Sequence, residues 1–201
     1  MYEIKAVIFD WGGVLIDDPM PFMMKFCASE LNLSEKKLIQ VYQEYANDFQ
    51  TNRISEESLW KEISARLGIH QISIDLLWMN AFKLAYKPKK EMFTLLSLLK
   101  SNEYKTGLLS NTEKKVMDYF YTLDYHFIDI AVFSCGEKIM KPDLKIYKII
   151  LRRMNVMPEE TIFIDDKIDN IKGAKISGMK PILFENPLQV RQELIHLGVK
   201  L

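Results

Sequence analysis

The sequence has few of the residues that make covalent or metal crosslinks. It contains two cysteines, Cys27 and Cys135, which lie far apart, and only three histidines among 201 residues. No group of cysteines and histidines has the spacing of a zinc site. We therefore expect two reduced, buried thiols and no disulfide, as is usual in a cytoplasmic protein.

The sequence also lacks an excess of charge and any long apolar run. Its 27 basic and 27 acidic residues give a formal net charge of zero, so no broad basic field attracts nucleic acid or an anionic membrane. No apolar stretch is long enough to cross a bilayer, and Asp10 interrupts the first one too early for a signal peptide. We expect a cytoplasmic, globular protein, a monomer or weak homodimer, with no nucleic-acid or membrane partner.

A short apolar run near the N-terminus ends in an acid and two glycines. Residues 6–9 have the length and β-branching of a buried strand. Asp10 follows directly, and Gly12 and Gly13 permit a tight turn close to a bound group. Because open α/β sheets bind ligands at the carboxyl ends of their strands, Asp10 is a candidate functional residue.

The following seventy residues have helical patterns only. Apolar spacing and capping residues predict helices that begin near residues 19, 34, 55 and 73, the last ending before Pro88. We expect residues 17–87 to form a helical-bundle cap inserted after the first strand, with hinges near Asp17–Asp18 and Tyr86–Pro88.

From residue 89 onward, helix and strand patterns alternate. The expected strands cover 106–110, 130–134, 161–165 and 181–184, and the expected helices cover 91–100, 113–123, 142–154, 170–177 and 188–197. This alternation is typical of right-handed crossovers and a parallel sheet. The predicted fold class is α/β, a doubly wound, Rossmann-like core of residues 1–16 and 88–201.

Polar residues follow the predicted strands at the edge where the strands meet. Ser110 and Asn111 follow one strand, Asp165 and Asp166 another, and Lys141 precedes a helix. Alone, each group fits a turn, a helix start or a capping pair. Together, the carboxylates suit a hard cation, and the lysine and hydroxyl suit phosphate oxygens.

These motifs resemble those of the haloacid dehalogenase-like (HAD) hydrolase superfamily, in the branch whose helical cap follows motif one. The similarity covers essentially the whole chain. Motif one is 9–15, motif two is 109–112, motif three is 141–143 followed by Ile146 and Tyr147, and motif four is 163–166 with Asn170, Gly173 and Ala174. The resemblance implies the α/β core described above and a hydrolase activity.

The resemblance also implies a nucleophile and a metal site. Asp10 would attack phosphorus and become an aspartyl-phosphate. Asp10, the backbone carbonyl of Gly12, and Asp165 would bind Mg²⁺, with Asp166 as a further metal residue, directly or through water. Two cations, Mg²⁺ and a lysine, would then stand between the attacking carboxylate and the phosphate dianion.

The remaining implied residues bind the phosphate. The Ser110 hydroxyl and the Asn111 backbone would donate hydrogen bonds to it, and Lys141 would neutralise charge on both Asp10 and the phosphate. Asp10, Ser110 and Lys141 are therefore the expected catalytic residues. Trp11, beside the nucleophile, either lines the substrate pocket or packs against the cap.

One position departs from the phosphatases of this superfamily. They usually carry a second aspartate two residues after the nucleophile, as a general acid and base, and Gly12 occupies that position here. Such a group is typically worth roughly 10²–10⁴ in rate. Asp17 or Asp18 either substitutes for it, or belongs to the hinge and the helix start, which is the interpretation we favour.

The resulting hypothesis is a Mg²⁺-dependent phosphatase that hydrolyses a small phosphorylated metabolite, such as a sugar phosphate, under the cap. One alternative is a metal-independent 2-haloacid dehalogenase, against which Asp165 and Asp166 argue. The other is a binding protein that keeps the fold with weakened catalysis, for which Gly12 is the only support.

Overall fold

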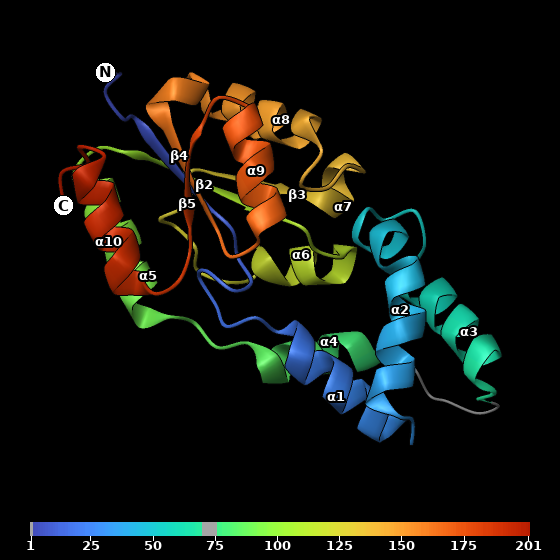
Figure 1. The fold of residues 1–201 in the computed structure, drawn as a ribbon. Coiled ribbons are helices and arrows are strands. Elements are labelled where there is room, and N and C mark those ends of the chain that lie inside the picture. Colours follow the sequence, from blue (N-terminus) through green and yellow to red (C-terminus); the bar gives the residue numbers. More distant parts are fainter. Residues whose placement is uncertain (1, 70–75) are drawn as a thin grey trace.

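The computed structural model describes residues 2–69 and 76–201 and has the predicted doubly wound α/β fold (Figure 1). Its sheet contains β1 (Ala6–Phe9), β2 (Lys105–Ser110), β3 (Ile130–Phe133), β4 (Thr161–Asp165) and β5 (Lys180–Leu183). The strands are all parallel, in the order β3-β2-β1-β4-β5. The order reverses beside the central β1, and this reversal opens a crevice at the carboxyl ends of the strands.

Helices cover both faces of the sheet. On one face lie α5 (Lys90–Ser101) and α10 (Pro187–His196), and on the other lie α8 (Leu144–Met154) and α9 (Ile168–Ile176) (Figure 1). α8 shows why the sequence folds this way. Its buried residues recur at helical spacing and pack in a hydrophobic cluster with residues of the sheet. They are Ile146, Tyr147, Ile150, Leu151 and Met154.

Four further helices lie together beside the carboxyl edge of the sheet, and we call them the cap helices (Figure 1). They are α1 (Met20–Glu30), α2 (Glu35–Gln50), α3 (Glu56–Leu67) and α4 (Leu77–Ala85). Trp60 and Trp78 are almost fully buried among them. The expected start of the fourth helix, Ser73, lies outside the described residues. No helix in the described chain is both long and apolar enough to cross a membrane.

The two segments that connect the cap helices to the sheet are hydrogen-bonded to each other. Asp17 N donates to Lys87 O at 2.9 Å, and Lys89 N donates to Leu15 O at 2.9 Å. The Lys89 ammonium adds bonds to Ile16 O at 2.9 Å and to Asp17 Oδ1 at 2.7 Å. The two segments predicted to be hinges therefore lie side by side and are hydrogen-bonded to each other.

Several local predictions were wrong or incomplete. Helix α6 (Lys114–Phe120) is shorter than predicted, because the chain turns at Thr122, whose amide bonds to Tyr119 O. The short helices α7 (Ser134–Glu137) and η1 (Pro158–Glu160) were not predicted. Cys27 and Cys135 are both buried and unpaired, which confirms that prediction.

Ser134, the first residue of α7, connects the core with the cap helices. Its hydroxyl donates to Gln50 O, at the end of α2, at 2.6 Å. It also accepts from Thr112 N at 2.9 Å and lies 3.3 Å from Thr112 O, a second acceptor. These bonds tie the start of α7 to the β2–α6 loop and to the end of α2.

Gly173 permits close packing of α9 against α8. A Cβ at Gly173 would lie 2.8 Å from Tyr147 Oη and 3.1 Å from Pro142 O, and Tyr147 Oη donates to Asn170 O at 2.8 Å. Alanine is about 1 kcal/mol better than glycine in a free helix, but overpacking costs about 1–3 kcal/mol. We expect the overlap to outweigh the gain in helix propensity, so that Gly173→Ala lowers the free energy of unfolding in urea, by up to about 2 kcal/mol.

Gly136→Ala is the matched control, because the nearest atom to its added Cβ is Met117 Sδ at 3.8 Å. We expect this variant to retain or slightly raise the stability. A Gly173→Ala protein that is as stable as the wild type would contradict the packing argument.

Candidate active site

The site is built around Asp10, directly after the central strand β1. The Asp10 amide donates to Ile164 O at 2.9 Å, which fixes the strand end, and its side chain is only 5% exposed. Trp11 N donates to Asp10 Oδ1 at 2.7 Å. The loop then turns through Gly13, whose φ of +87° is one that other residues rarely adopt. The Asp10 carboxylate is thereby held at the carboxyl edge of the sheet.

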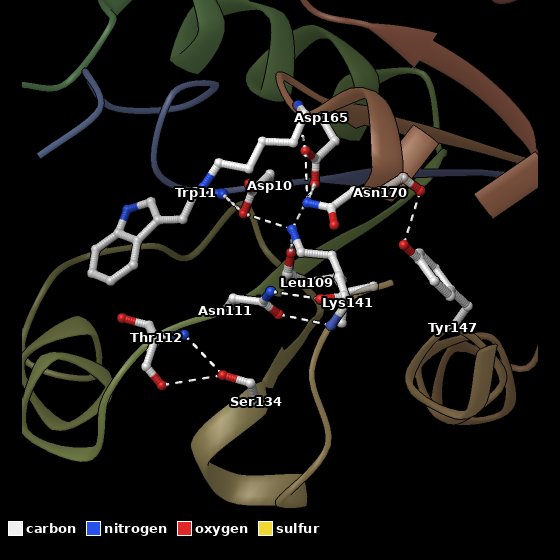
Figure 2. A network of polar contacts seen from close by, with 11 residues as sticks. Asp10, Trp11, Leu109, Asn111, Thr112, Ser134, Lys141, Tyr147, Asp165 and Asn170 are labelled. Atoms are coloured by element: carbon white, nitrogen blue, oxygen red, sulfur yellow. Dashed lines mark hydrogen bonds and ion pairs between the residues drawn. The ribbon is translucent and has the colours of Figure 1, made fainter. Parts of the chain in front are cut away.

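Lys141 lies between two carboxylates in the interior. Its Nζ is 2.9 Å from Asp10 Oδ1, 2.7 Å from Asp165 Oδ2 and 2.7 Å from Leu109 O, and the side chain is 1% exposed (Figure 2). Burial alone lowers the pKa of Lys141, but Asp10 and Asp165 outweigh it and raise that pKa. Burial raises the pKa of Asp10 to about 7, against the opposing effect of Lys141. The lysine is therefore charged and shared.

Asp165 is the last residue of β4, and Asp166 follows it, beside Asp10. Asp165 Oδ1 accepts from Lys167 N at 2.8 Å and from Asn170 Nδ2 at 2.9 Å, which orients the group. Asp166 Oδ1 is buried and has no hydrogen-bond partner among the described residues. Burial, with the charge of Asp165 as a second cause, raises the pKa of Asp166.

The three carboxyl groups form a compact set. One oxygen each from Asp10, Asp165 and Asp166 lies within 4.8 Å of the other two. A Cβ on Gly13 would overlap the Asp166 carboxylate, so the glycine makes room for it. Oxygen atoms of this kind and spacing are suited to a hard divalent cation, and the orphaned Asp166 Oδ1 is free to bind one.

The Asn111 side chain positions the Lys141 loop. Asn111 Nδ2 donates to Lys141 O at 3.0 Å, and Lys141 N donates to Asn111 Oδ1 at 2.9 Å (Figure 2). Ser110, the last residue of β2, is 4% exposed. The sequence analysis gave a role only to the backbone of Asn111 and missed this paired side chain, whose only signal is its place at a strand end.

A cavity of about 60 Å³ opens between this edge and the cap helices. Its core wall consists of Asp10, Trp11, Gly12, Ile16, Ser110, Asn111, Thr112, Glu113, Lys141, Lys167 and Asn170. The opposite wall consists of Asp18, Pro19, Met20, Met23, Gln50 and Phe82. Most of the candidate residues therefore meet here, and Asp165 joins them through Lys141. Glu113 and Gln50 were not predicted as cavity residues. The sequence placed Glu113 at the start of a helix and Gln50 within a helix of the predicted cap.

Trp11 both lines the cavity and packs against the cap. Its ring is 2% exposed and contacts Phe82 of α4 at a centroid distance of 5.5 Å and Phe120 of α6 at 5.2 Å. Its Nε1 donates to Tyr125 Oη at 2.9 Å. The two interpretations of Trp11 left open by the sequence are thus compatible.

The acids near Gly12 have different surroundings. Asp17 pairs with Lys89 at 2.7 Å, where the two connecting segments run side by side. Asp18 lines the cavity, and its Oδ1 accepts from Met20 N at 3.1 Å, at the start of α1. A Cβ on Gly12 would lie 3.2 Å from Pro19 Cδ, so the loop has little free space for a larger residue.

Fold and site together define an α/β protein with an acidic centre at the carboxyl end of its middle strand. A family model described as haloacid dehalogenase-like hydrolase matches residues 4–178, and the chain belongs to this family of hydrolases.

Three similar proteins illustrate the family. D-ribitol-5-phosphate phosphatase of Bacteroides thetaiotaomicron is 26% identical over 95% of this chain and 97% of its own length. A HAD family enzyme of Bacteroides thetaiotaomicron, in complex with magnesium and inorganic phosphate, has a TM-score of 0.74 and 22% identity, covering 90% of this chain and 94% of that one. Acyl-CoA dehydrogenase family member 10 of Mus musculus is 26% identical over 97% of this chain, which spans only 20% of that protein.

Replacing Lys141 by methionine removes the shared cation but keeps a long side chain. Asp10 and Asp165 would then lie buried without it, and removing one member of a buried ion pair costs about 3–5 kcal/mol. We expect Lys141→Met to lower the free energy of unfolding in urea by about that amount. Unfolding should be measured at pH 8, which is above the pKa of Asp10, and with EDTA present to remove divalent cations.

Lys172→Met is the control, because Lys172 is exposed and pairs with the exposed Asp169 at 2.9 Å. Its effect should stay within about 0.5 kcal/mol. Equal stabilities for the two variants would show that Lys141 does not hold the strand ends together.

Proposed function

We propose that this protein is a Mg²⁺-dependent phosphomonoester hydrolase that acts on a small phosphorylated metabolite. The observation that carries the proposal is the buried Asp10 carboxylate beside both a shared lysine and the Asp165–Asp166 pair. The ribitol-phosphate phosphatase and the magnesium–phosphate complex among the similar proteins support it. A metal-independent dehalogenase would have no use for a third, unpartnered carboxylate at Asp166.

Asp10 acts as the nucleophile in this mechanism. Trp11 N and Lys141 Nζ both contact its Oδ1 and so fix the orientation of the carboxylate. Asp10 lines the cavity. A carboxylate oxygen attacks phosphorus, the P–O bond to the alcohol breaks, and the alcohol oxygen takes a proton from solvent water as it leaves, because Gly12 offers no side-chain acid. Water then hydrolyses the resulting aspartyl-phosphate and regenerates Asp10.

The remaining residues counter the repulsion between Asp10 and the incoming dianion. Lys141 contributes one fixed positive charge. Asp10, Asp165, Asp166 and the Gly12 carbonyl would hold Mg²⁺, which when bound supplies the positive charge that lets a carboxylate approach a phosphate.

The phosphate oxygens need donors on the side away from the cation. Ser110, the last residue of β2, and Asn111, which follows it, lie on the same wall as Asp10. Donors that are fixed before the reaction stabilise charge that develops in the transition state. We assign phosphate binding to these two groups together with Lys141.

We also propose that the cap helices, within residues 17–87, form a cap over a core of residues 1–16 and 88–201. The cap helices supply Met20, Met23, Gln50 and Phe82 to the cavity wall. A cap in this place excludes bulk water and contacts the alcohol part of the substrate.

Asp10→Asn tests the mechanism, because the amide keeps the shape of the side chain but is a poor nucleophile. With p-nitrophenyl phosphate and Mg²⁺, we expect phosphate release to fall to the uncatalysed background in this variant. EDTA should have the same effect on the wild type, and excess Mg²⁺ should restore the activity. The measurement is the initial rate of p-nitrophenol release.

Asp169→Asn is a matched control, since Asp169 is exposed and, within residues 2–69 and 76–201, forms an ion pair only with Lys172. It should hydrolyse the ester at the wild-type rate. Full activity of Asp10→Asn, or a wild-type rate unaffected by EDTA, would exclude the mechanism.

A further inference from the structure

The cavity at the proposed active site has two basic residues on its walls, Lys141 and Lys167. Besides Asp10, the acids Asp18 and Glu113 also line it. A phosphate ester that enters the cavity carries about two negative charges at neutral pH. Among the described residues, the two lysines are therefore the cavity-lining side chains that can balance this charge.

Lys141 has no N–H group left for a ligand. An ammonium group has three N–H donors, and Lys141 Nζ already lies 2.7 Å from Leu109 O, 2.7 Å from Asp165 Oδ2 and 2.9 Å from Asp10 Oδ1. The side chain is also only 1% exposed. Lys141 therefore contributes its charge to the site, while its donors are occupied by protein oxygens.

Lys167 has the opposite surroundings. It is exposed, and its Nζ forms no ion pair within residues 2–69 and 76–201. Its backbone is fixed at the start of α9, because Lys167 N donates to Asp165 Oδ1 at 2.8 Å and Lys167 O accepts from Ile171 N at 3.1 Å. The side chain is long and flexible, so its ammonium group is free to contact a ligand in the cavity that it lines.

Lys167 also lies close to the acidic centre. Burial raises the pKa of Asp10 to about 7 and also raises the pKa of Asp166, and the positive charge of Lys167 is one of the effects that lower both. A charge that acts on these two carboxyl groups also acts on a phosphoryl group that is brought to Asp10.

The charges of the centre show why such a cation is needed. Asp10, Asp165 and Asp166 bind a metal ion in their ionised form, in which they carry three negative charges. Lys141 and a divalent cation together carry three positive charges. The centre with its metal ion is therefore neutral without Lys167, and has no net charge left to attract a dianion.

We propose that Lys167 binds the phosphoryl group of the substrate and supplies the net positive charge that attracts a phosphate dianion into the cavity. The inference rests on the phosphatase function proposed above and adds a substrate-binding residue to it. The contact is a charge-assisted hydrogen bond from Lys167 Nζ to a phosphate oxygen. Because Lys167 is exposed, its charge also acts on the approaching substrate, and salt weakens this effect.

Lys167→Met tests the assignment, because methionine keeps much of the length of the side chain and removes the charge. Inorganic phosphate is titrated into the Mg²⁺-loaded protein by isothermal titration calorimetry. We expect the Kd for phosphate to rise about tenfold in Lys167→Met and to stay within about threefold of the wild type in Lys167→Arg, which keeps the charge. The inference is overturned if Lys167→Met has the wild-type Kd, if Lys167→Arg binds as weakly as Lys167→Met, or if the wild type binds no phosphate.

Lys172→Met is the matched control, because Lys172 is an exposed lysine of α9 that pairs with Asp169 and does not line the cavity. Its Kd for phosphate should stay within about twofold of the wild type. Titration of Mg²⁺ without phosphate separates the proposed role from an effect on the metal site. Removal of a positive charge near the acids should leave the affinity for Mg²⁺ unchanged or raise it, and weaker binding of Mg²⁺ by Lys167→Met would overturn the inference.

Hydrolysis of p-nitrophenyl phosphate provides a second readout. We expect the KM of Lys167→Met to rise about tenfold, and kcat/KM to fall less steeply with added NaCl in this variant than in the wild type. If the phosphatase proposal fails, the ester is not hydrolysed, but phosphate binding still depends on Lys167. If the inference about Lys167 fails, the ester is hydrolysed and Lys167→Met has the KM, salt dependence and phosphate affinity of the wild type.

Discussion

The ammonium group of Lys141 joins the two strand ends that form the site. It contacts Asp10 after β1 and Asp165 at the end of β4 at 2.9 and 2.7 Å, inside the protein. Two carboxylates so placed repel each other, and a shared cation between them makes the arrangement possible. The position of Lys141 depends in turn on Asn111, after β2, whose side chain bonds twice to the Lys141 backbone. Three loops of the sheet edge are thus linked through one charge.

This arrangement separates two tasks within one small cavity. The charged chemistry lies on the core side, around Asp10, Lys141 and the Asp165–Asp166 pair. The opposite side, where Met23 and Phe82 lie, is mostly apolar. Trp11 contacts both sides, because it follows the proposed nucleophile in sequence and packs against Phe82 of the cap helices with a tilted ring. In the proposed function, changes to the cap wall would alter substrate choice without moving the charged groups, as long as Trp11 keeps its contacts.

The sequence predicted those parts of the fold and site that follow from local pattern. The run before Asp10 and the run before Asp165 are short, apolar and β-branched, so both were predicted as strands with acids at their ends. Parallel topology then requires these ends to meet. The free, buried state of Cys27 and Cys135 followed equally from their separation in the chain.

The contacts that depend on tertiary packing could not be predicted in this way. The sequence predicts Glu113 only as an ordinary acid at the start of a helix. Nothing nearby in the sequence shows that the side chains of Gln50 and Trp78 will contact it. The pairing of the Asn111 side chain with a backbone 30 residues later has no local signal either. Helix α7 was not predicted because it is only four residues long and follows β3 directly, which leaves no helical pattern to detect.

That hydroxyl has a mechanical consequence for the cap. Ser134 Oγ donates to Gln50 O at 2.6 Å, but Thr112 O lies within reach at 3.3 Å. If α2 moves away, the hydrogen turns to Thr112 and is not left unpaired in the interior. The donor of this contact between the core and α2 therefore has a second acceptor within reach, so displacement of α2 leaves no unpaired hydroxyl hydrogen in the core.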